Sequence, residues 1–193
     1  MEDEATLLEQ ARAGTESAFD YLVRPYLSRA YRTACLITQQ EELARDALQE
    51  ALVRTYLSLR KFRTGGPFYA WFIRIVVNEA IRQTRRRRRE AALPLPDPAD
   101  AATPEAALLA REERRELWST IQELAPDHRA VIVLRYFEGP TEAEMAAVLG
   151  VSPGTVKSRL NWARRALEQR ISEPQVTRSL LRPLGVPGGM ARA

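Results

Sequence analysis

Hydrophobic residues recur at three- and four-residue spacing along much of the chain, which is the pattern of amphipathic helices. An early run is "ESAFDYLVRPYLSRAYRTACLI", in which Pro25 predicts a kink or break because proline lacks a backbone donor. A later run, "EELARDALQEALVRTYLSLRKF", predicts a second long helix. Its expected core positions are Leu43, Ala47, Leu48, Ala51, Leu52, Thr55, Tyr56 and Leu59.

A third helix is predicted after the "TGGP" loop, beginning just beyond Pro67 with "FYAWFIRIVVNEAIRQTRRRRR". The periodicity then stops in "AALPLPDPADAATPEAA", whose prolines indicate an extended linker over residues 91–107. Helical spacing resumes over residues 108–172 and ends before a Pro/Gly-rich tail, residues 173–193. We therefore predict an all-α fold, with helical domains at 1–90 and 108–172 joined by a flexible Pro-rich linker.

Capping signals divide the second domain into short helices. Thr141 and Glu144 have the spacing of a capping box, in which each residue satisfies a backbone donor of the other. Gly150 supplies a left-handed turn residue, Ser152 can cap the last helix, and Pro153 fits its first position. A helix, a tight glycine turn and a second helix form a helix-turn-helix.

The last helix has one apolar stripe and one polar face. Val156, Leu160, Ala163 and Leu167 share the stripe and are expected in the core. A helix in a DNA major groove needs donors for base edges and cations for phosphates. The alternative is an ordinary solvated surface. We predict that this face binds DNA through Lys157, Ser158, Arg159, Asn161, Trp162, Arg164 and Arg165.

Charge alternates along the 193 residues. The net charge of +4 divides into −3 over residues 1–60, +7 over 61–90, −6 over 91–151 and +6 over 152–193. Two basic stretches between acidic ones predict two separate contacts with a polyanion.

Individual residues exclude several kinds of chemistry. The one cysteine, Cys35, rules out an internal disulfide and is expected as a small buried hydrophobe in a reducing cytosol. The one histidine, His128, is interpreted as a polar residue at a helix start. The acidic N-terminus is no signal peptide, and the most apolar span is too short to cross a membrane. We expect a cytoplasmic protein without a membrane segment of its own.

The first basic stretch combines a glycine loop, an aromatic cluster and five consecutive arginines. Cations for the backbone and rings for the bases suit single-stranded or unstacking DNA. For Phe68 and Phe72, four residues apart, core packing is the preferred interpretation, while Trp71 fits either role. Arginines at a helix end also complement the helix dipole, but the run Arg85–Arg89 exceeds that need and favours phosphate contact.

The two segments together resemble a known family. "DALQEALVRTYLSLRKFR…FYAWFIRIVVNEAIRQTRRR" resembles the second conserved region of the extracytoplasmic-function (ECF) branch of bacterial sigma factors. "LAPDHRAVIVLRYFEGPTEAEMAAVLGVSPGTVKSRLNWARRAL" resembles their fourth region. Asn161 and Trp162 stand where small or basic residues are often found in the family. Glu79 and Gln83 are departures within the segment that resembles the −10-reading helix of the family.

The resemblance implies a role for each segment. The N-terminal domain would bind the clamp coiled coil of core RNA polymerase through Asp46, Gln49, Glu50 and Val53. It would capture the −10 element of the opening promoter through Arg63, Thr64, Phe68, Trp71, Arg74, Asn78, Arg82, Arg85 and Arg86. The second domain would read the −35 element in duplex form, beside the polymerase flap. The family also implies an anti-sigma factor as a partner.

Two other classes stay open at this point. A stand-alone helix-turn-helix regulator, with an N-terminal sensing or dimerisation domain, explains residues 108–172 equally well. It leaves the "TGGP" loop and the arginine run without a role. An enzyme acting on nucleic acid would need a metal-binding carboxylate cluster or an activated nucleophile. The sequence has no such motif, so we expect no enzymatic activity, no cofactor and no metal.

Overall fold

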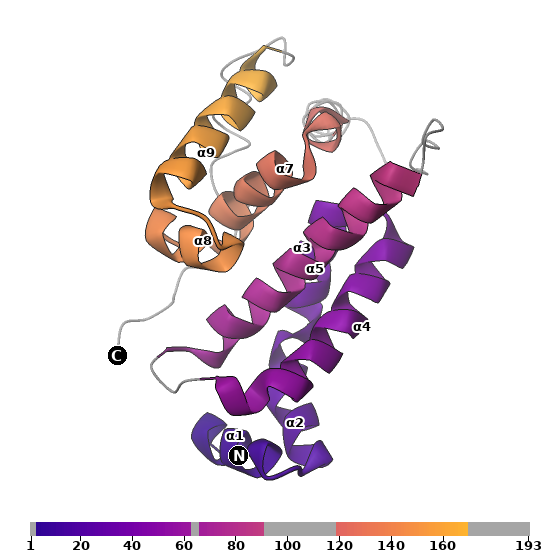
Figure 1. The fold of residues 1–193 in the computed structure, drawn as a ribbon, viewed down its shortest axis with the longest axis vertical. Coiled ribbons are helices and arrows are strands. Elements are labelled where there is room, and N and C mark those ends of the chain that lie inside the picture. Colours follow the sequence, from indigo (N-terminus) through magenta and orange to yellow (C-terminus); the bar gives the residue numbers. More distant parts are fainter. Residues whose placement is uncertain (1–2, 63–65, 91–118, 170–193) are drawn as a thin grey trace, which may run out of the picture. The chain divides into compact units, whose positions relative to one another are not determined.

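The structure, a computed structural model, describes residues 3–62, 66–90 and 119–169. Every regular element in these ranges is a helix, in the order traced in Figure 1, so the predicted all-α class is confirmed. The chain divides into two compact units, one made mainly of the residues up to Arg87 and the other mainly of those from Arg88 onward. Within the described ranges, no helix is long and apolar enough to cross a membrane.

The N-terminal unit begins with two short helices, α1 (Glu4–Arg12) and α2 (Glu16–Val23). The 3-10 turn η1 (Arg24–Tyr26) then separates α2 from α3 (Leu27–Thr38). Pro25 lies inside this turn, so the predicted break is confirmed at the proline.

Two longer helices complete this unit. α4 (Glu41–Ser58) continues into the 3-10 turn η2 (Leu59–Lys61), and α5 (Phe68–Glu90) begins directly after the proline, as predicted. Figure 1 shows α3, α4 and α5 running alongside one another. The Arg12 guanidinium of α1 donates hydrogen bonds to the carbonyls of Leu59 and Phe62, which fixes the segment leading into the loop before α5.

The buried side of α4 differs in part from the prediction. Ala44, Ala47, Ala51 and Thr55 are buried, whereas Leu43, Leu48 and Leu52 are only half-buried and Tyr56 is 37% exposed. Small residues let the backbones of packed helices approach closely, so the alanine line, not the leucine line, faces the core. With the alanines of α4 facing the core, the side chains of Val53 and Leu57 are 51% and 75% exposed.

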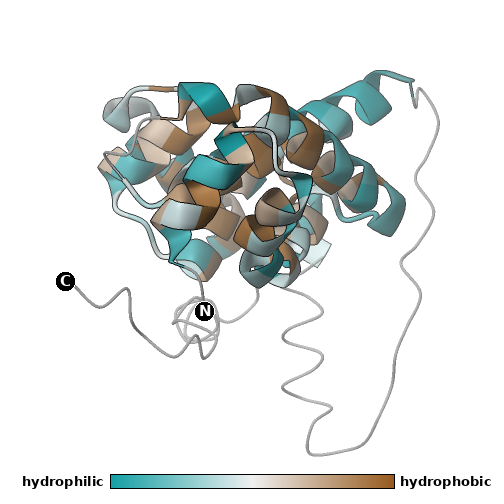
Figure 2. Ribbon diagram, turned by 90° about the horizontal axis from the view of Figure 1, so that it is seen from below, coloured by the Kyte–Doolittle hydropathy of each residue, from teal (hydrophilic) through white to brown (hydrophobic). Residues whose placement is uncertain are grey.

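The second unit is described from residue 119, where residues 119–123 are helical. α7 (Pro126–Val133) follows and runs into the π-helical turn η3 (Leu134–Glu138). α8 (Glu142–Leu149) and α9 (Pro153–Glu168) complete the helix-turn-helix. Individual helices of the protein carry hydrophobic positions on one side and hydrophilic positions on another (Figure 2).

The predicted caps of this unit are present. The Glu144 carboxylate accepts hydrogen bonds from the backbone N–H and hydroxyl of Thr141, and the Glu144 N–H donates back to the Thr141 hydroxyl. The bond from the backbone N–H lowers the pKa of Glu144. Gly150 adopts φ +66°, and the Ser152 hydroxyl accepts from the N–H of Thr155 at 3.1 Å. The α9 helix therefore has a fixed start.

Candidate nucleic-acid interface

The α9 helix presents a polar face opposite its buried stripe. Val156, Leu160, Ala163 and Leu167 are at most 2% exposed, as the spacing predicts. Five of the seven residues predicted to bind DNA are exposed. They are Lys157, Ser158, Asn161, Trp162 and Arg165.

The other two predicted DNA-binding residues of α9 have partners within the protein. Arg159 forms an ion pair with Asp127 of α7, with a nitrogen–oxygen distance of 3.2 Å. The Nε of Arg164 donates to the hydroxyl of Tyr136 in η3, also at 3.2 Å. Both arginines are half-buried and anchor α9 to α7 and to the turn η3 that follows it. The spacing of residues along α9 does not reveal Asp127 and Tyr136 as partners, because both lie on other elements.

Trp162 stacks on His128. Their ring centroids are 4.1 Å apart and their planes differ by 20°, while 52% of Trp162 stays exposed. The buried Nδ1 of His128 has no hydrogen-bond partner among the described residues. Burial and the nearby Arg159 cation lower the pKa of His128, so the imidazole is neutral at pH 7. His128 lies near the start of α7, as predicted, and also supports a residue of the recognition face.

A buried arginine that the sequence pattern did not single out ties this unit together. Arg129 is 3% exposed and donates to the carbonyls of Ile121, Gln122 and Leu124. These carbonyls end the helix at residues 119–123, so a side chain closes that helix. Burial lowers the pKa of Arg129 to about 10, and the guanidinium stays charged at neutral pH.

In the N-terminal unit, most residues predicted to contact the −10 element lie on one face of α5. Their spacing of three or four residues places them on adjacent turns. Arg63 and Thr64 lie outside the described residues. Trp71 is half-buried, and the exposed members are Arg74, Asn78, Arg82, Arg85 and Arg86.

Phe68 is a correction to the predicted site. Its side chain is fully buried, in edge-on contact with Phe62 at 5.8 Å and stacked on Phe72 at 6.1 Å. This agrees with the core packing that its spacing from Phe72 favours, and it removes the ring from the DNA-facing set. Phe62 precedes the loop and Phe68 follows it, so their contact closes the loop at its base. Trp71 packs on Phe62 at 5.0 Å.

A buried carboxylate lies beneath the α5 face. Glu79 is 4% exposed, and its two oxygens bind two arginines. Oε1 lies 2.8 Å from Nε of Arg54 on α4, and Oε2 lies 2.6 Å from Nε of Arg82 on α5. The Arg82 guanidinium also lies 4.0 Å from Glu50 of α4. The sequence pointed to Glu79 only as unusual, because its partners depend on how two helices pack.

The residues predicted to bind core polymerase are all exposed on α4. They are Asp46, Gln49, Glu50 and Val53.

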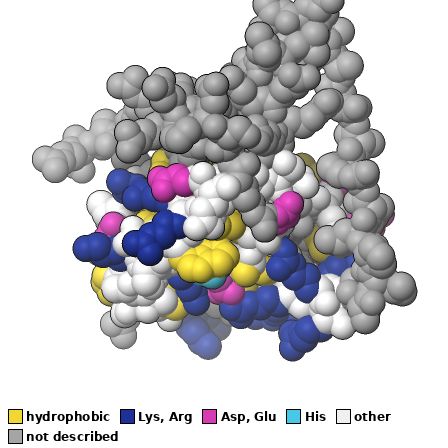
Figure 3. Space-filling view, turned by 90° about the horizontal axis from the view of Figure 1, so that it is seen from above, with side chains coloured by type: hydrophobic (Ala, Val, Ile, Leu, Met, Phe, Trp, Pro, Cys, Tyr) yellow, Lys and Arg dark blue, Asp and Glu magenta, His cyan; other side chains and the backbone are white. Residues whose placement is uncertain are grey.

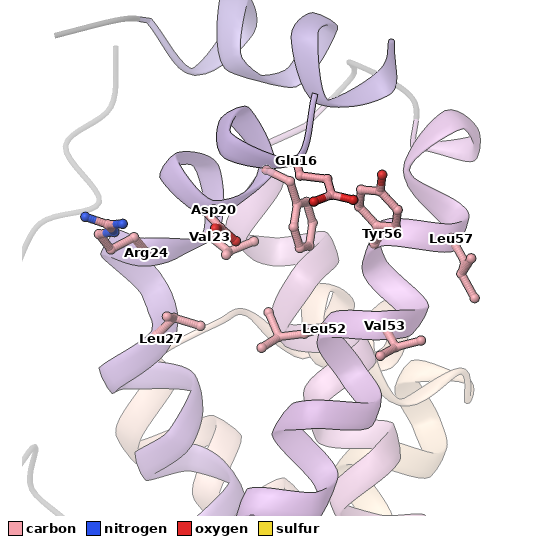
Figure 4. A pocket seen from close by; sticks show the side chains of 10 residues that line it. Glu16, Asp20, Val23, Arg24, Leu27, Leu52, Val53, Tyr56 and Leu57 are labelled. Atoms are coloured by element: carbon pink, nitrogen blue, oxygen red, sulfur yellow. The ribbon is translucent and has the colours of Figure 1, made fainter. Parts of the chain in front are cut away.

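Beside Val53, an apolar groove of about 530 Å³ runs between α2, η1 and α4. Its lining includes Val23, Leu27, Leu52, Tyr56 and Leu57, with Glu16, Asp20 and Arg24 at its polar positions (Figure 4). In the sequence, the sign of such a groove is the presence of apolar residues on the outer side of α4. The surface beside the predicted polymerase contact is therefore apolar as well as charged.

Basic residues are numerous on the described part of the face in Figure 3, where an apolar patch lies beside the histidine. Among the residues that the structure describes, no group of three or more His, Cys, Asp or Glu side chains could hold a metal ion. Contacts by cations and rings are the chemistry that these surfaces offer to a nucleic acid.

A helix-turn-helix in one unit and an exposed basic helix face in the other define a helical DNA-binding protein. Residues 22–90 match the family "Sigma-70 region 2", and residues 114–167 match "Sigma-70, region 4". The chain is 32% identical over 182 residues to the RNA polymerase sigma-H factor of Pseudomonas aeruginosa, covering 88% of this chain and 94% of that protein. It belongs to the ECF branch of the bacterial RNA polymerase sigma factors.

Further relatives agree with this assignment. The ECF RNA polymerase sigma-E factor of Escherichia coli strain K12 is 30% identical over 186 residues, covering 89% of this chain and 95% of the relative. CnrH, solved in complex with the cytosolic domain of CnrY, is 29% identical with a TM-score of 0.61, over 86% of this chain and 95% of that one. The sigma factor RpoE of Bartonella quintana, at 23% identity and a TM-score of 0.62, covers 81% and 98% of the two chains and supports the fold alone.

Proposed function

We propose that this ECF sigma factor binds core RNA polymerase, directs it to promoters with −10 and −35 elements, and opens the DNA for transcription initiation. The observation that carries the proposal is the line of exposed cationic and amide side chains on α5, within the match to sigma-70 region 2. A stand-alone helix-turn-helix regulator has no use for a second DNA-binding surface of this kind.

The −35 element is assigned to α9. Lys157, Ser158 and Asn161 lie toward the N-terminal half of the exposed face, where a recognition helix contacts base edges. Arg165 supplies a phosphate contact, and Trp162 offers a flat apolar surface to sugars or thymine methyl groups. Arg159 and Arg164 hold α9 in place and reach phosphate with the donors that their protein partners leave unused.

The −10 element is assigned to the loop and to α5. Arg63 and Thr64 belong to the loop that would hold a flipped base. Trp71, Arg74, Asn78, Arg82, Arg85 and Arg86 would then contact the non-template strand. Unstacking DNA costs a few kcal/mol per step, and capture of the separated strand offsets this cost. The domain borders of this assignment are 1–90 and 108–172, with residues 91–107 as the linker.

Core polymerase is assigned to the outer side of α4. Asp46, Gln49 and Glu50 supply polar contacts to the clamp coiled coil, and Val53 supplies an apolar one beside the groove. The second domain would lie beside the polymerase flap. This function places the protein in the cytoplasm with the polymerase and the chromosome. The polymerase performs the chemistry, so no reaction and no cofactor are assigned to this chain.

An anti-sigma factor is the further partner that the family implies. The relative CnrH is in complex with the cytosolic domain of CnrY, which supports a further protein partner for this chain. Such a partner would keep the sigma factor inactive by covering its polymerase-binding surfaces.

Binding of forked promoter DNA tests the proposal. Labelled fork-junction DNA is titrated with this protein alone, with bacterial core polymerase alone, and with both together. The proposal requires tight, sequence-dependent binding only with both, and Glu50→Lys should weaken assembly with core because it reverses a charge on the α4 surface. Tight binding to duplex DNA by the protein alone, unchanged by core, would instead identify a stand-alone regulator.

A further inference from the structure

Glu79 is an acidic residue on the inner side of a helix whose outer side is basic. It is 4% exposed, so its charge requires partners to offset the loss of water. Each carboxylate oxygen has one: Arg54 of α4 at 2.8 Å and Arg82 of α5 at 2.6 Å. One buried carboxylate thus joins the polymerase-facing helix to the DNA-facing helix.

The geometry at Arg82 leaves part of its guanidinium available. Its Nε donates to Glu79, and a terminal nitrogen lies 4.0 Å from Glu50. A guanidinium carries five N–H donors in a fixed plane, so a bond at Nε sets the direction of the remaining ones. The Arg82 side chain is still 43% exposed, which places that oriented plane at the surface of the α5 face.

We propose that Glu79 is a positioning residue for strand capture, acting through Arg82. The inference rests on the proposed function, since it assumes that the α5 face binds the non-template strand. By fixing Nε, Glu79 holds the outer edge of Arg82 toward a phosphate or base, and little rotamer entropy is lost when the strand arrives. A long surface arginine without such a support would lose that entropy on binding.

A purely structural role for Glu79 makes a different prediction. If the carboxylate only stabilises the packing of α4 on α5, then Glu79→Gln and Arg54→Gln should weaken strand binding alike, and Glu79→Gln should have the same effect with and without Arg82. If it positions Arg82, the two partners are unequal. Loss of Arg54 should leave strand binding nearly unchanged, and loss of Arg82 should remove the effect of Glu79 altogether.

The test is a double-mutant cycle on strand binding by the holoenzyme. A single-stranded DNA pool with a randomised centre is first enriched with the wild-type protein and core polymerase, and the enriched oligonucleotide is the probe. Affinities are measured for Glu79→Gln, Arg82→Ala, the double variant and the control Arg54→Gln. Thermal unfolding of each free variant is recorded in parallel, so that stability and positioning are read separately.

We expect Glu79→Gln to weaken strand binding on the order of tenfold, because hydrogen bonds between charged groups contribute at about this level. In the Arg82→Ala background the same change should have almost no further effect. Arg54→Gln should change strand affinity by about twofold or less, because Arg54 lies on α4 and not among the residues assigned to the strand, and the cost of leaving the buried Oε1 of Glu79 unpaired should appear in the unfolding temperature instead. Glu79→Asp, which keeps the charge, should recover part of the affinity.

Equal and additive losses for Glu79→Gln and Arg82→Ala would overturn the proposal, as would an Arg54→Gln defect as large as that of Glu79→Gln. Failure of the proposed function has another signature. In that case the wild-type protein with core polymerase enriches no oligonucleotide from the pool. The wild-type complex then shows no strand affinity with which the variants could be compared.

Discussion

Trp162 is the large aromatic residue on the exposed face of α9, and it is held by a neighbouring ring. Its indole is stacked on the neutral imidazole of His128, and the adjacent Arg159 is paired with Asp127. These contacts join α9 to the start of α7, so the exposed half of the ring has a fixed orientation. A rigid aromatic surface favours van der Waals contact over hydrogen bonding, so under the proposed assignment of α9 to the −35 element this position would have a selectivity of its own.

Asn161→Ala tests the neighbouring contact. An asparagine amide can pair with two adenine edge atoms, and each such pair contributes about 1–3 kcal/mol of base discrimination. We expect relaxed preference at one −35 position in a holoenzyme selection from randomised duplexes, with unchanged affinity for core polymerase. Loss of core binding would instead mean that the second domain is assigned to the wrong partner.

The pH dependence of stability tests the state of His128. Its lowered folded pKa means that the unfolded chain binds more protons, so the contribution to stability is complete above the ordinary pKa of 6.5. This contribution is lost as the pH falls through the folded value. Thermal unfolding of the full chain should therefore begin at lower temperature as the pH falls from about 7 to about 5.

His128→Gln is the matched control, since it cannot take up a proton and should remove this part of the pH dependence. Asp127 and Arg159 are the charged groups that face the imidazole, and both are retained in that variant. Glu144 also has a lowered pKa, but its contribution is lost only below its ordinary value of 4.5. An identical pH profile in the control would show that His128 does not titrate in this range.

At the scale of helices, local signals predicted the second unit well. The capping box at Thr141 and Glu144, the left-handed Gly150 and the cap at Ser152 all depend on neighbours in sequence, and all are present. The break at Pro25 follows from the missing donor of one residue. Signals of this kind need no knowledge of what packs against the helix.

Tertiary packing decided the features that the sequence left open. On α4, the alanine line faces the core because small residues allow close packing, so Tyr56 and Leu57 face outward. The buried Glu79 and the half-buried Arg159 depend on partners from another helix. Periodicity indicates that a helix has two faces, but the partner helix determines which residues are buried.

Ser152→Ala tests how far the cap fixes the recognition helix. Loss of an N-cap hydroxyl costs about 1 kcal/mol, and the first turn of α9 carries Thr155 and Val156 next to the DNA-facing residues. We expect the midpoint of thermal unfolding to fall by a few degrees and the −35 affinity to fall with it. Ser152→Asn is the matched comparison, because asparagine keeps a side-chain oxygen that can accept the same hydrogen bond from the Thr155 N–H.

For the molecule as a whole, the alternation of charge along the sequence parallels the proposed assignment of α5 and α9 to DNA and of α4 to the polymerase. The +7 stretch over residues 61–90 includes α5, and the +6 stretch over 152–193 includes α9. The acidic start of the chain includes the outer side of α4 with Asp46 and Glu50. The charge of each stretch thus agrees with the partner proposed for it, while individual contacts such as the ion pair of Arg159 with Asp127 do not follow from charge along the sequence.

Replacement of Arg85–Arg89 by alanine tests the larger of these basic stretches. For single-stranded DNA, each phosphate that the protein no longer neutralises should reduce the slope of log affinity against log salt by about 0.7. We expect weaker open-complex formation and a flatter salt dependence, measured by promoter opening at several salt concentrations. An unchanged slope would mean that the arginines serve the helix end and not the DNA.

Run-off transcription tests the central assignment most directly. Bacterial core polymerase is supplied with a pool of genomic fragments, with and without this protein, and new transcript starts are mapped. A sigma factor must produce discrete starts only when it is present, and their aligned upstream sequences must share a −10 and a −35 element at fixed spacing. The absence of new starts, together with duplex binding that needs no polymerase, would contradict the assignment.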